Sequence, residues 1–164
     1  MKQNNQFLVS LDKYNVISMI GSGSFARVLL IEDKETKSKY AAKIFNMDSN
    51  YFFNVEKMIH FLSNFRHPTL LNILGYSPVD FDGNKFLTII TKYSPLSSLQ
   101  EVIKKIQTNP LDNTILQIIL VGISRGMLFL HKNKIIHRDL KPANVIIDEN
   151  YHPHISGFTL CTEY

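Results

Sequence analysis

Apolar and β-branched residues form three short runs near the start of the chain, each bounded by turn-forming residues. The runs are YNVISMIG at 14–21, ARVLLIE at 26–32 and KYAAKIF at 39–45. Glycines precede the second run, and the polar stretch DKETKS precedes the third. Runs of this length between turn residues are typical of strands joined by hairpins. The sequence therefore predicts a three-stranded meander.

The apolar spacing then changes to the three- and four-residue steps of a helix. After the cap-like residues 48–50, apolar side chains recur at Phe52, Val55, Ile59 and Leu62, which predicts an amphipathic helix. A second hairpin follows, with strands NILGYSPV and KFLTIIT joined through Asp82-Gly83, a pair that tolerates positive φ in a tight turn.

Residues 93–98, YSPLSS, separate this strand pattern from a helical one and are predicted to be a hinge between two lobes. Helices are expected at 99–106 and 114–132, followed by the short apolar runs IIH, NVIID and PHISGF, with a turn at 148–150. The helix at 114–132 is apolar on nearly every face, so we expect it to be buried. Its polar and glycine interruptions argue against a membrane span.

Composition narrows the classes of protein only slightly. The chain has 164 residues, 45% hydrophobic and 20% charged, which is ordinary for a soluble globular domain. The net charge is +4, and no run of basic residues is long enough for a nucleic-acid-binding arm, so nucleic-acid binding is not expected. The lone Cys161 is expected to be inert, the six histidines lack zinc-site spacing, and the start has no signal peptide. We therefore expect a reducing, cytoplasmic setting and no membrane.

Two local patterns suit phosphate binding, although each has a structural alternative. GSGSFARV, from Gly21 to Val28, puts glycines between two strands, where backbone can approach phosphate oxygens, but a plain hairpin explains it about as well. Lys43 lies within a strand and needs an anion to offset its desolvation, for which Glu56 on the following helix is a candidate. A purely structural ion pair is locally the better explanation.

The octet HRDLKPAN at 137–144 is the most specific chemical signal. Asp139 offers a carboxylate to accept a hydroxyl proton, and Lys141 a cation to neutralise a transferred phosphate. Five positions after Asp139, Asn144 offers an amide oxygen for a metal. Chance assembly of all eight residues is improbable.

Taken together, these elements resemble the eukaryotic protein kinase family, in which they recur in this order over nearly the whole chain. GSGSFARV resembles the glycine-rich loop, YAAK at 40–43 the strand with the ATP-binding lysine, and Glu56 the helix acid that pairs with it. The resemblance implies that ATP is the cofactor. It implies a nucleotide site made by the following residues: Gly21, Ser22, Gly23, Val28, Ala41, Lys43, Glu56, Thr91 and Tyr93.

The resemblance also implies a subclass. Lys141, two residues after the aspartate, is the serine/threonine pattern, and HPTLLNILGY at 67–76 resembles tyrosine-kinase-like members. FLTIITKYSPLSSL resembles the last strand and hinge, which puts Thr91 at the gatekeeper position and Tyr93 on the adenine edge.

One motif departs from the family pattern. Where the family has Asp-Phe-Gly, whose aspartate holds magnesium, this chain has Gly157, Phe158 and Thr159. Asn144 would then hold Mg²⁺ weakly or not at all. Loss of that metal would slow phosphotransfer by a factor on the order of 10³.

We therefore expect an α+β fold: a complete N-lobe over 14–92, with a five-stranded antiparallel sheet and one helix, and an incomplete helical C-lobe over 93–164. The expected function is a serine/threonine-type protein kinase domain that binds ATP, with phosphotransfer lost or greatly weakened. Three alternatives remain open: a pseudokinase acting as a binding or scaffold module, a fragment of an active kinase, and a gene remnant. A protein partner covering the apolar helix at 114–132 is also expected.

Overall fold

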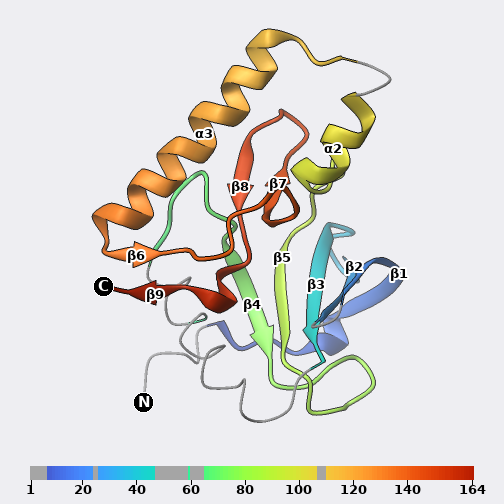
Figure 1. Cartoon of the computed structure of the whole chain (residues 1–164). Helices are drawn as coiled ribbons and strands as arrows, with labels where there is room; N and C mark the ends of the chain where they lie inside the picture. Colours follow the sequence, from blue (N-terminus) through green and yellow to red (C-terminus); the bar gives the residue numbers. More distant parts are fainter. Residues whose placement is uncertain (1–6, 24–25, 47–58, 60–64, 107–109) are drawn as a thin grey trace. The chain divides into compact units, whose positions relative to one another are not determined.

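The computed structural model describes residues 7–23, 26–46, 59, 65–106 and 110–164 (Figure 1). The chain divides into two compact units, the first made of residues 1–64 and 72–93 and the second of residues 65–71 and 94–164. The helix predicted after Asn50, including Glu56, lies outside the described residues except for Ile59, which is helical and buried.

The first unit contains a five-stranded antiparallel sheet, as the sequence predicts. A short 3-10 turn, η2 (Leu11–Lys13), leads into β1 (Tyr14–Ser22), β2 (Ala26–Asp33) and β3 (Lys39–Phe45), which form the predicted meander. The second hairpin supplies β4 (Ile73–Ser77) and β5 (Thr88–Lys92). The strand order is β1-β2-β3-β5-β4, so β5 pairs with β3 and leaves β4 at an edge.

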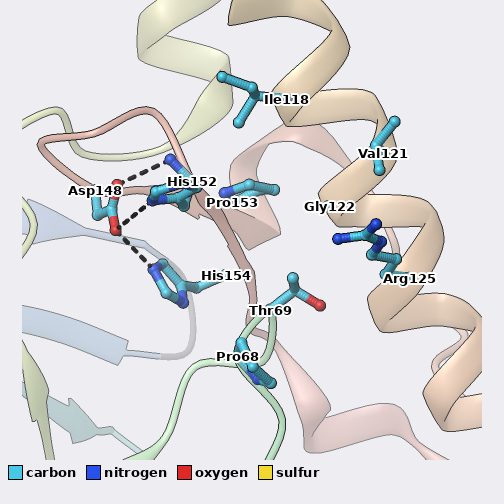
Figure 2. A pocket seen from close by; sticks show the side chains of 10 residues that line it. All are labelled: Pro68, Thr69, Ile118, Val121, Gly122, Arg125, Asp148, His152, Pro153 and His154. Carbon is cyan, nitrogen blue, oxygen red and sulfur yellow. Dashed lines mark hydrogen bonds and ion pairs between the residues drawn. The ribbon is translucent and has the colours of Figure 1, made fainter.

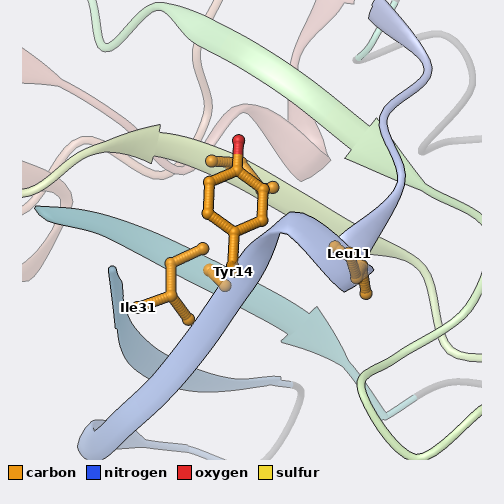
Figure 3. Packing of buried hydrophobic residues seen from close by; sticks show 5 residues of the cluster. Leu11, Tyr14 and Ile31 are labelled. Carbon is orange, nitrogen blue, oxygen red and sulfur yellow. The ribbon is translucent and has the colours of Figure 1, made fainter. Parts of the chain in front are cut away.

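A hydrophobic cluster covers one side of this sheet. It joins residues of η2, β1, β2, β3 and β5, of which Leu11, Tyr14 and Ile31 are labelled in Figure 3, and it also includes Ala42 and Ile90. Ile31, Ala42 and Ile90 are fully buried. Alternation along the strands therefore leaves their neighbours, such as Ala41 and Lys43, on the opposite face.

A buried carboxylate fixes the loop between β4 and β5. Asp80 accepts hydrogen bonds from the backbone N–H groups of Asp82 and Asn84. Its carboxylate also forms an ion pair, 2.8 Å long, with the guanidinium of Arg27 on β2. Burial would raise the pKa of Asp80, but these donors outweigh it and lower the pKa. Gly83, in the predicted turn, has a φ of 80°.

The second unit is built on two helices and two small antiparallel sheets. Its helices are α2 (Leu99–Ile106) and α3 (Asn113–Lys132), and Asp112 caps α3 by accepting the N–H of Thr114 at 2.7 Å. The remaining elements are β6 (Ile135–Ile136), η4 (Pro142–Asn144), β7 (Val145–Ile147), β8 (Pro153–Ile155), η5 (Phe158–Leu160) and β9 (Thr162–Glu163). β6 pairs with β9, and β7 pairs with β8.

The expectation that the long apolar helix is buried is wrong for the described residues. Only Ile119, Gly122, Gly126 and Leu130 of α3 are buried, and large apolar side chains such as Leu120 are exposed. α3 is long and apolar enough to cross a membrane by length and composition alone, with 22% of its most apolar window buried. Its buried residues recur every three or four positions, so α3 packs through one stripe.

Candidate functional site

The segment predicted to be catalytic follows β6 and ends in the 3-10 turn η4. Its first residue, His137, is buried, donates through Nε2 to the carbonyl of Ser156 at 2.9 Å, and accepts the Asp139 N–H through Nδ1 at 3.2 Å. Its ring packs edge-on against Phe158 with centroids 5.1 Å apart. Burial lowers the pKa of His137, so the imidazole is neutral and its two hydrogen bonds hold the start of the loop in place.

Asp139 is the centre of a network of three side chains. One carboxylate oxygen lies 2.9 Å from Lys141 Nζ, and the other accepts a hydrogen bond from Asn144 Nδ2 at 2.8 Å. The hydrogen bond from Lys141, followed by that from Asn144, lowers the pKa of Asp139. The carboxylate is therefore ionised at neutral pH, as a group that accepts a proton must be.

Asn144 is held from both its side chain and its backbone. Its Nδ2 also donates to the Asp139 carbonyl at 2.7 Å, and its own carbonyl accepts the N–H of Ser156 at 2.7 Å and the Ser156 hydroxyl at 3.0 Å. The sequence did not single out Ser156, because a serine between two apolar runs carries no motif of its own. In the structure it joins His137 to Asn144.

Gly157 is the residue at the metal position of the family pattern, and it has no side chain to offer a metal. Its backbone is left-handed, with φ 86° and ψ 33°. A Cβ added there would lie 2.5 Å from Asn144 Cγ, 2.6 Å from Nδ2 and 2.8 Å from Oδ1. The Asn144 amide therefore fills the space into which a side chain at position 157 would project.

This arrangement does not fit a magnesium ion. Mg²⁺ is usually held by one or two carboxylates and near-ideal octahedral oxygen geometry. Asn144 offers one amide oxygen, Gly157 offers none, and the Asp139 carboxylate is engaged by Lys141 and Asn144. Among the residues that the structure describes, no group of three or more His, Cys, Asp or Glu side chains could hold a metal elsewhere.

The strand residues expected to bind nucleotide share one face of the first unit's sheet. Direct register partners are Gly21 with Val28, Val28 with Lys43, and Ala41 with Thr91. Directly opposed residues of an antiparallel pair point to the same side, and so do residues two apart on one strand. These five residues therefore lie on the face opposite the Leu11–Tyr14–Ile31 cluster, and all five are only partly buried.

The glycines of the predicted phosphate loop are not required by the hairpin itself. Neither Gly21 nor Gly23 has a positive φ. A Cβ at Gly21 would meet Val28 at 3.7 Å and one at Gly23 would meet the Ala26 carbonyl at 3.9 Å, both ordinary contacts. Ser22 is exposed and pairs with Arg27. Neither the backbone angles nor the contacts at these two positions therefore require glycine for the hairpin to form.

Lys43 lies in the middle of the sheet between β2 and β5. It is partly buried, and its Nζ lies 5.1 Å from the centre of the Phe45 ring, near enough for a cation–π contact. The predicted pairing with Glu56 stays a prediction, because Glu56 lies outside the described residues. Tyr93, which is predicted to lie on the adenine edge, is also partly buried.

Cys161 is the remaining residue with nucleophilic chemistry near the catalytic segment. Burial raises the pKa of its thiol, so the reactive thiolate is disfavoured at neutral pH.

Comparison with known proteins agrees with this architecture. The chain is 29% identical to Protein kinase 3 of Dictyostelium discoideum over 97% of its length and 18% of that protein, and 27% identical to human Serine/threonine-protein kinase 32B over 94% and 37%. It is 32% identical to Serine/threonine-protein kinase PBL27 of Arabidopsis thaliana over 87% and 28%. The chain thus spans well under half of these relatives. A family model described as protein kinase domain matches residues 14–164, and the chain belongs to that family.

Proposed function

We propose that this chain is a serine/threonine-type protein kinase domain that binds ATP and transfers phosphate poorly or not at all. The observation that carries the proposal is Gly157, which offers no metal ligand and above which the Asn144 amide fills the space. A metal at this point stabilises transferring charge by several kcal/mol, and each ~1.4 kcal/mol is a factor of ten in rate. Its loss would slow transfer by a factor on the order of 10³ or more.

ATP binding follows from family membership and is supported by the sheet face that carries Gly21 and Lys43. Lys43 is a cation on this face, where it would contact phosphate oxygens of the nucleotide. The glycines at 21 and 23, which the hairpin does not require, leave room for backbone N–H groups to approach a phosphate. We propose that this binding depends little on magnesium.

The catalytic segment keeps residues that could still assist a slow reaction. The ionised Asp139 would accept the proton of a substrate serine or threonine hydroxyl, and Lys141 beside it would neutralise charge on the transferred phosphate. The second candidate function, a pseudokinase that binds a partner without chemistry, is favoured by the same Gly157. The two differ in whether any transfer that depends on Asp139 remains.

Calorimetric titration of the chain with ATP, with and without magnesium, tests the binding proposal. We expect weak binding of similar affinity in both buffers and a loss of affinity in Lys43→Ala. Lys39→Ala, at the exposed start of the same strand, is the matched control and should bind as the unmodified chain does. A strict magnesium requirement, or an unchanged affinity in Lys43→Ala, would contradict the proposal.

Incorporation of radiolabelled phosphate into generic serine/threonine substrates tests the chemistry. We expect no detectable transfer. Transfer that disappears in Asp139→Asn would show that the domain is an active kinase.

A further inference from the structure

A pocket of about 450 Å³ lies within the second unit (Figure 2). Its walls come from α3, from residues 68–69, from the turn between β7 and β8, and from β8 itself. Ligand-binding sites commonly measure about 300–1,000 Å³, so the volume is sufficient for a few side chains of a ligand. Neither the nucleotide face nor the catalytic segment uses these residues.

The walls are held together by close packing and backbone hydrogen bonds. Gly122 lets α3 lie against Pro153, because a Cβ there would meet the proline ring at Cδ within 2.7 Å. Ile155 accepts the N–H of Leu71 and donates its own N–H to Thr69, both at 2.8 Å, which ties β8 to the segment before β4. The pocket is therefore preformed, which lowers the entropic cost of binding.

One end of the pocket carries the positive charge of Arg125. The Arg125 guanidinium points from α3 into the pocket (Figure 2), and in the described part of the chain it makes no hydrogen bond or ion pair. Burial lowers the pKa of nearby His67, and the Arg125 charge lowers it further.

The acid at the other end of the pocket is already satisfied. Asp148 accepts the backbone N–H groups of Asn150 at 2.9 Å and of His152 at 2.8 Å, and its second oxygen lies 3.3 Å from His154 Nε2. Burial works to raise the pKa of Asp148, but these donors outweigh it and lower the pKa. Asp148 is thus held by donors of its own hairpin, and among the described residues it makes no hydrogen bond or ion pair with Arg125.

Part of the apolar lining of the pocket is open to solvent. Ile118 is 36% exposed and Val121 48% exposed, although both are large apolar side chains. A free metabolite is usually enclosed over most of its surface, whereas a polypeptide segment needs only an open groove with an anchor for one or two side chains. The open wall beside an unpaired guanidinium therefore favours a polypeptide with an acidic residue next to apolar ones.

We infer that this pocket docks a short acidic-apolar segment of a partner polypeptide, with its carboxylate on Arg125 and a neighbouring apolar side chain on Val121 and Ile118. The inference is independent of nucleotide binding and of catalysis, because it uses none of their residues.

The probe is the capped tripeptide Ac-Leu-Glu-Leu-NH₂, titrated into the ¹⁵N-labelled chain and followed by the amide shifts of Gly122, Arg125 and His152. We expect saturable shifts at these positions. The affinity of the amide analogue Ac-Leu-Gln-Leu-NH₂ should be lower by a factor of about five, since the analogue lacks the negative charge. Raising the salt concentration should lower the affinity of the acidic peptide and leave the affinity of its analogue nearly unchanged.

Matched variants separate the two parts of the pocket. Arg125→Gln should weaken the acidic peptide about fivefold or more, and Lys132→Gln, the same charge change at an exposed position of α3, should not. Val121→Asn should weaken both peptides, whereas Leu120→Asn, at a position 65% exposed and outside the pocket, should not. Unchanged melting temperatures would show that these variants remain folded.

Three results would overturn the inference. The first is the absence of shifts up to the solubility limit of the peptide. The second is equal affinity for the Glu and Gln peptides, which would remove the role of Arg125. The third is equally tight binding of 4-methylpentanoate, which would make the pocket a site for small amphipathic acids.

Discussion

Gly157→Asp restores the family's metal ligand on paper, yet the structure predicts that it destabilises the chain. The backbone at this position is left-handed, with φ 86°. Aspartate visits that conformation more readily than most residues, but leaving glycine there still costs about 1 kcal/mol.

The larger cost comes from Asn144. The new Cβ would lie 2.5 Å from Asn144 Cγ, so the amide must move away. Moving it breaks two hydrogen bonds, from Nδ2 to the Asp139 carbonyl and to the Asp139 carboxylate. Each is worth about 0.5–1.5 kcal/mol, so the total loss is about 2–4 kcal/mol. Against a domain stability of about 5–15 kcal/mol, this should lower the melting temperature by roughly 5–15 °C.

Thermal unfolding followed by circular dichroism measures this loss, and two further variants assign it. Gly157→Ala adds the same Cβ without a carboxylate and should lose a similar amount. The double variant Asn144→Ala/Gly157→Asp lacks the obstructing amide. Its loss of melting temperature should therefore be smaller than the sum of the losses in Asn144→Ala and Gly157→Asp measured singly.

The ATP titration is then repeated on Gly157→Asp, where we expect no new dependence on magnesium. An unchanged melting temperature in Gly157→Asp, or magnesium-dependent ATP affinity in that variant alone, would refute the argument that Asn144 holds this space.

Two further predictions concern the second unit. Gly126→Ala should lower the free energy of unfolding by about 1–3 kcal/mol, because its Cβ would lie 2.7 Å from Ile155 Cδ1. This packing cost exceeds the roughly 0.5–1 kcal/mol by which alanine stabilises a helix relative to glycine. Chemical denaturation measures the change with the exposed Ser124→Ala as control, and a more stable Gly126→Ala would contradict the packing. Because burial lowers the folded pKa of His137, the unfolded chain binds more protons below about pH 6.5, so stability should be full above that pH and fall as pH decreases through it. The melting temperature measured from pH 7.5 to 5.5 should decrease less steeply in His137→Asn than in the unmodified chain, and equal slopes would show that His137 is not responsible.

Much of the fold could be predicted because its signals are local. The runs at 14–21, 26–32 and 39–45 are bounded by turn residues, and the structure places β1, β2 and β3 there. α2 has the predicted limits, and α3 begins at Asn113, one residue before the predicted Thr114 and directly after its cap, Asp112. The prediction that α3 is buried was wrong. An apolar pattern on every face shows which surfaces of a helix favour burial, but the neighbouring elements decide which of them are covered.

The sequence predicts which residues make up the catalytic segment but not their geometry. HRDLKPAN named Asp139, Lys141 and Asn144, and the structure brings these three side chains together. That the Asn144 amide fills the space above Gly157 depends on a rotamer and on the left-handed backbone at 157, neither of which a motif encodes. Arg125 belongs to no motif, and its pocket could not be predicted because segments distant in the sequence form it.

The position of β5 in the sheet has a consequence for synthesis on the ribosome. β4 is made before β5 but lies beyond it, so β5 must come between β3 and β4. After β3 has emerged, its free edge therefore waits for roughly 50 more residues, or a few seconds at 5–20 residues per second. During that interval an apolar strand with unpaired N–H and C=O groups is open to wrong partners. The nascent chain should accordingly be most prone to aggregation, and most dependent on chaperones, just before Thr88–Lys92 leaves the exit tunnel.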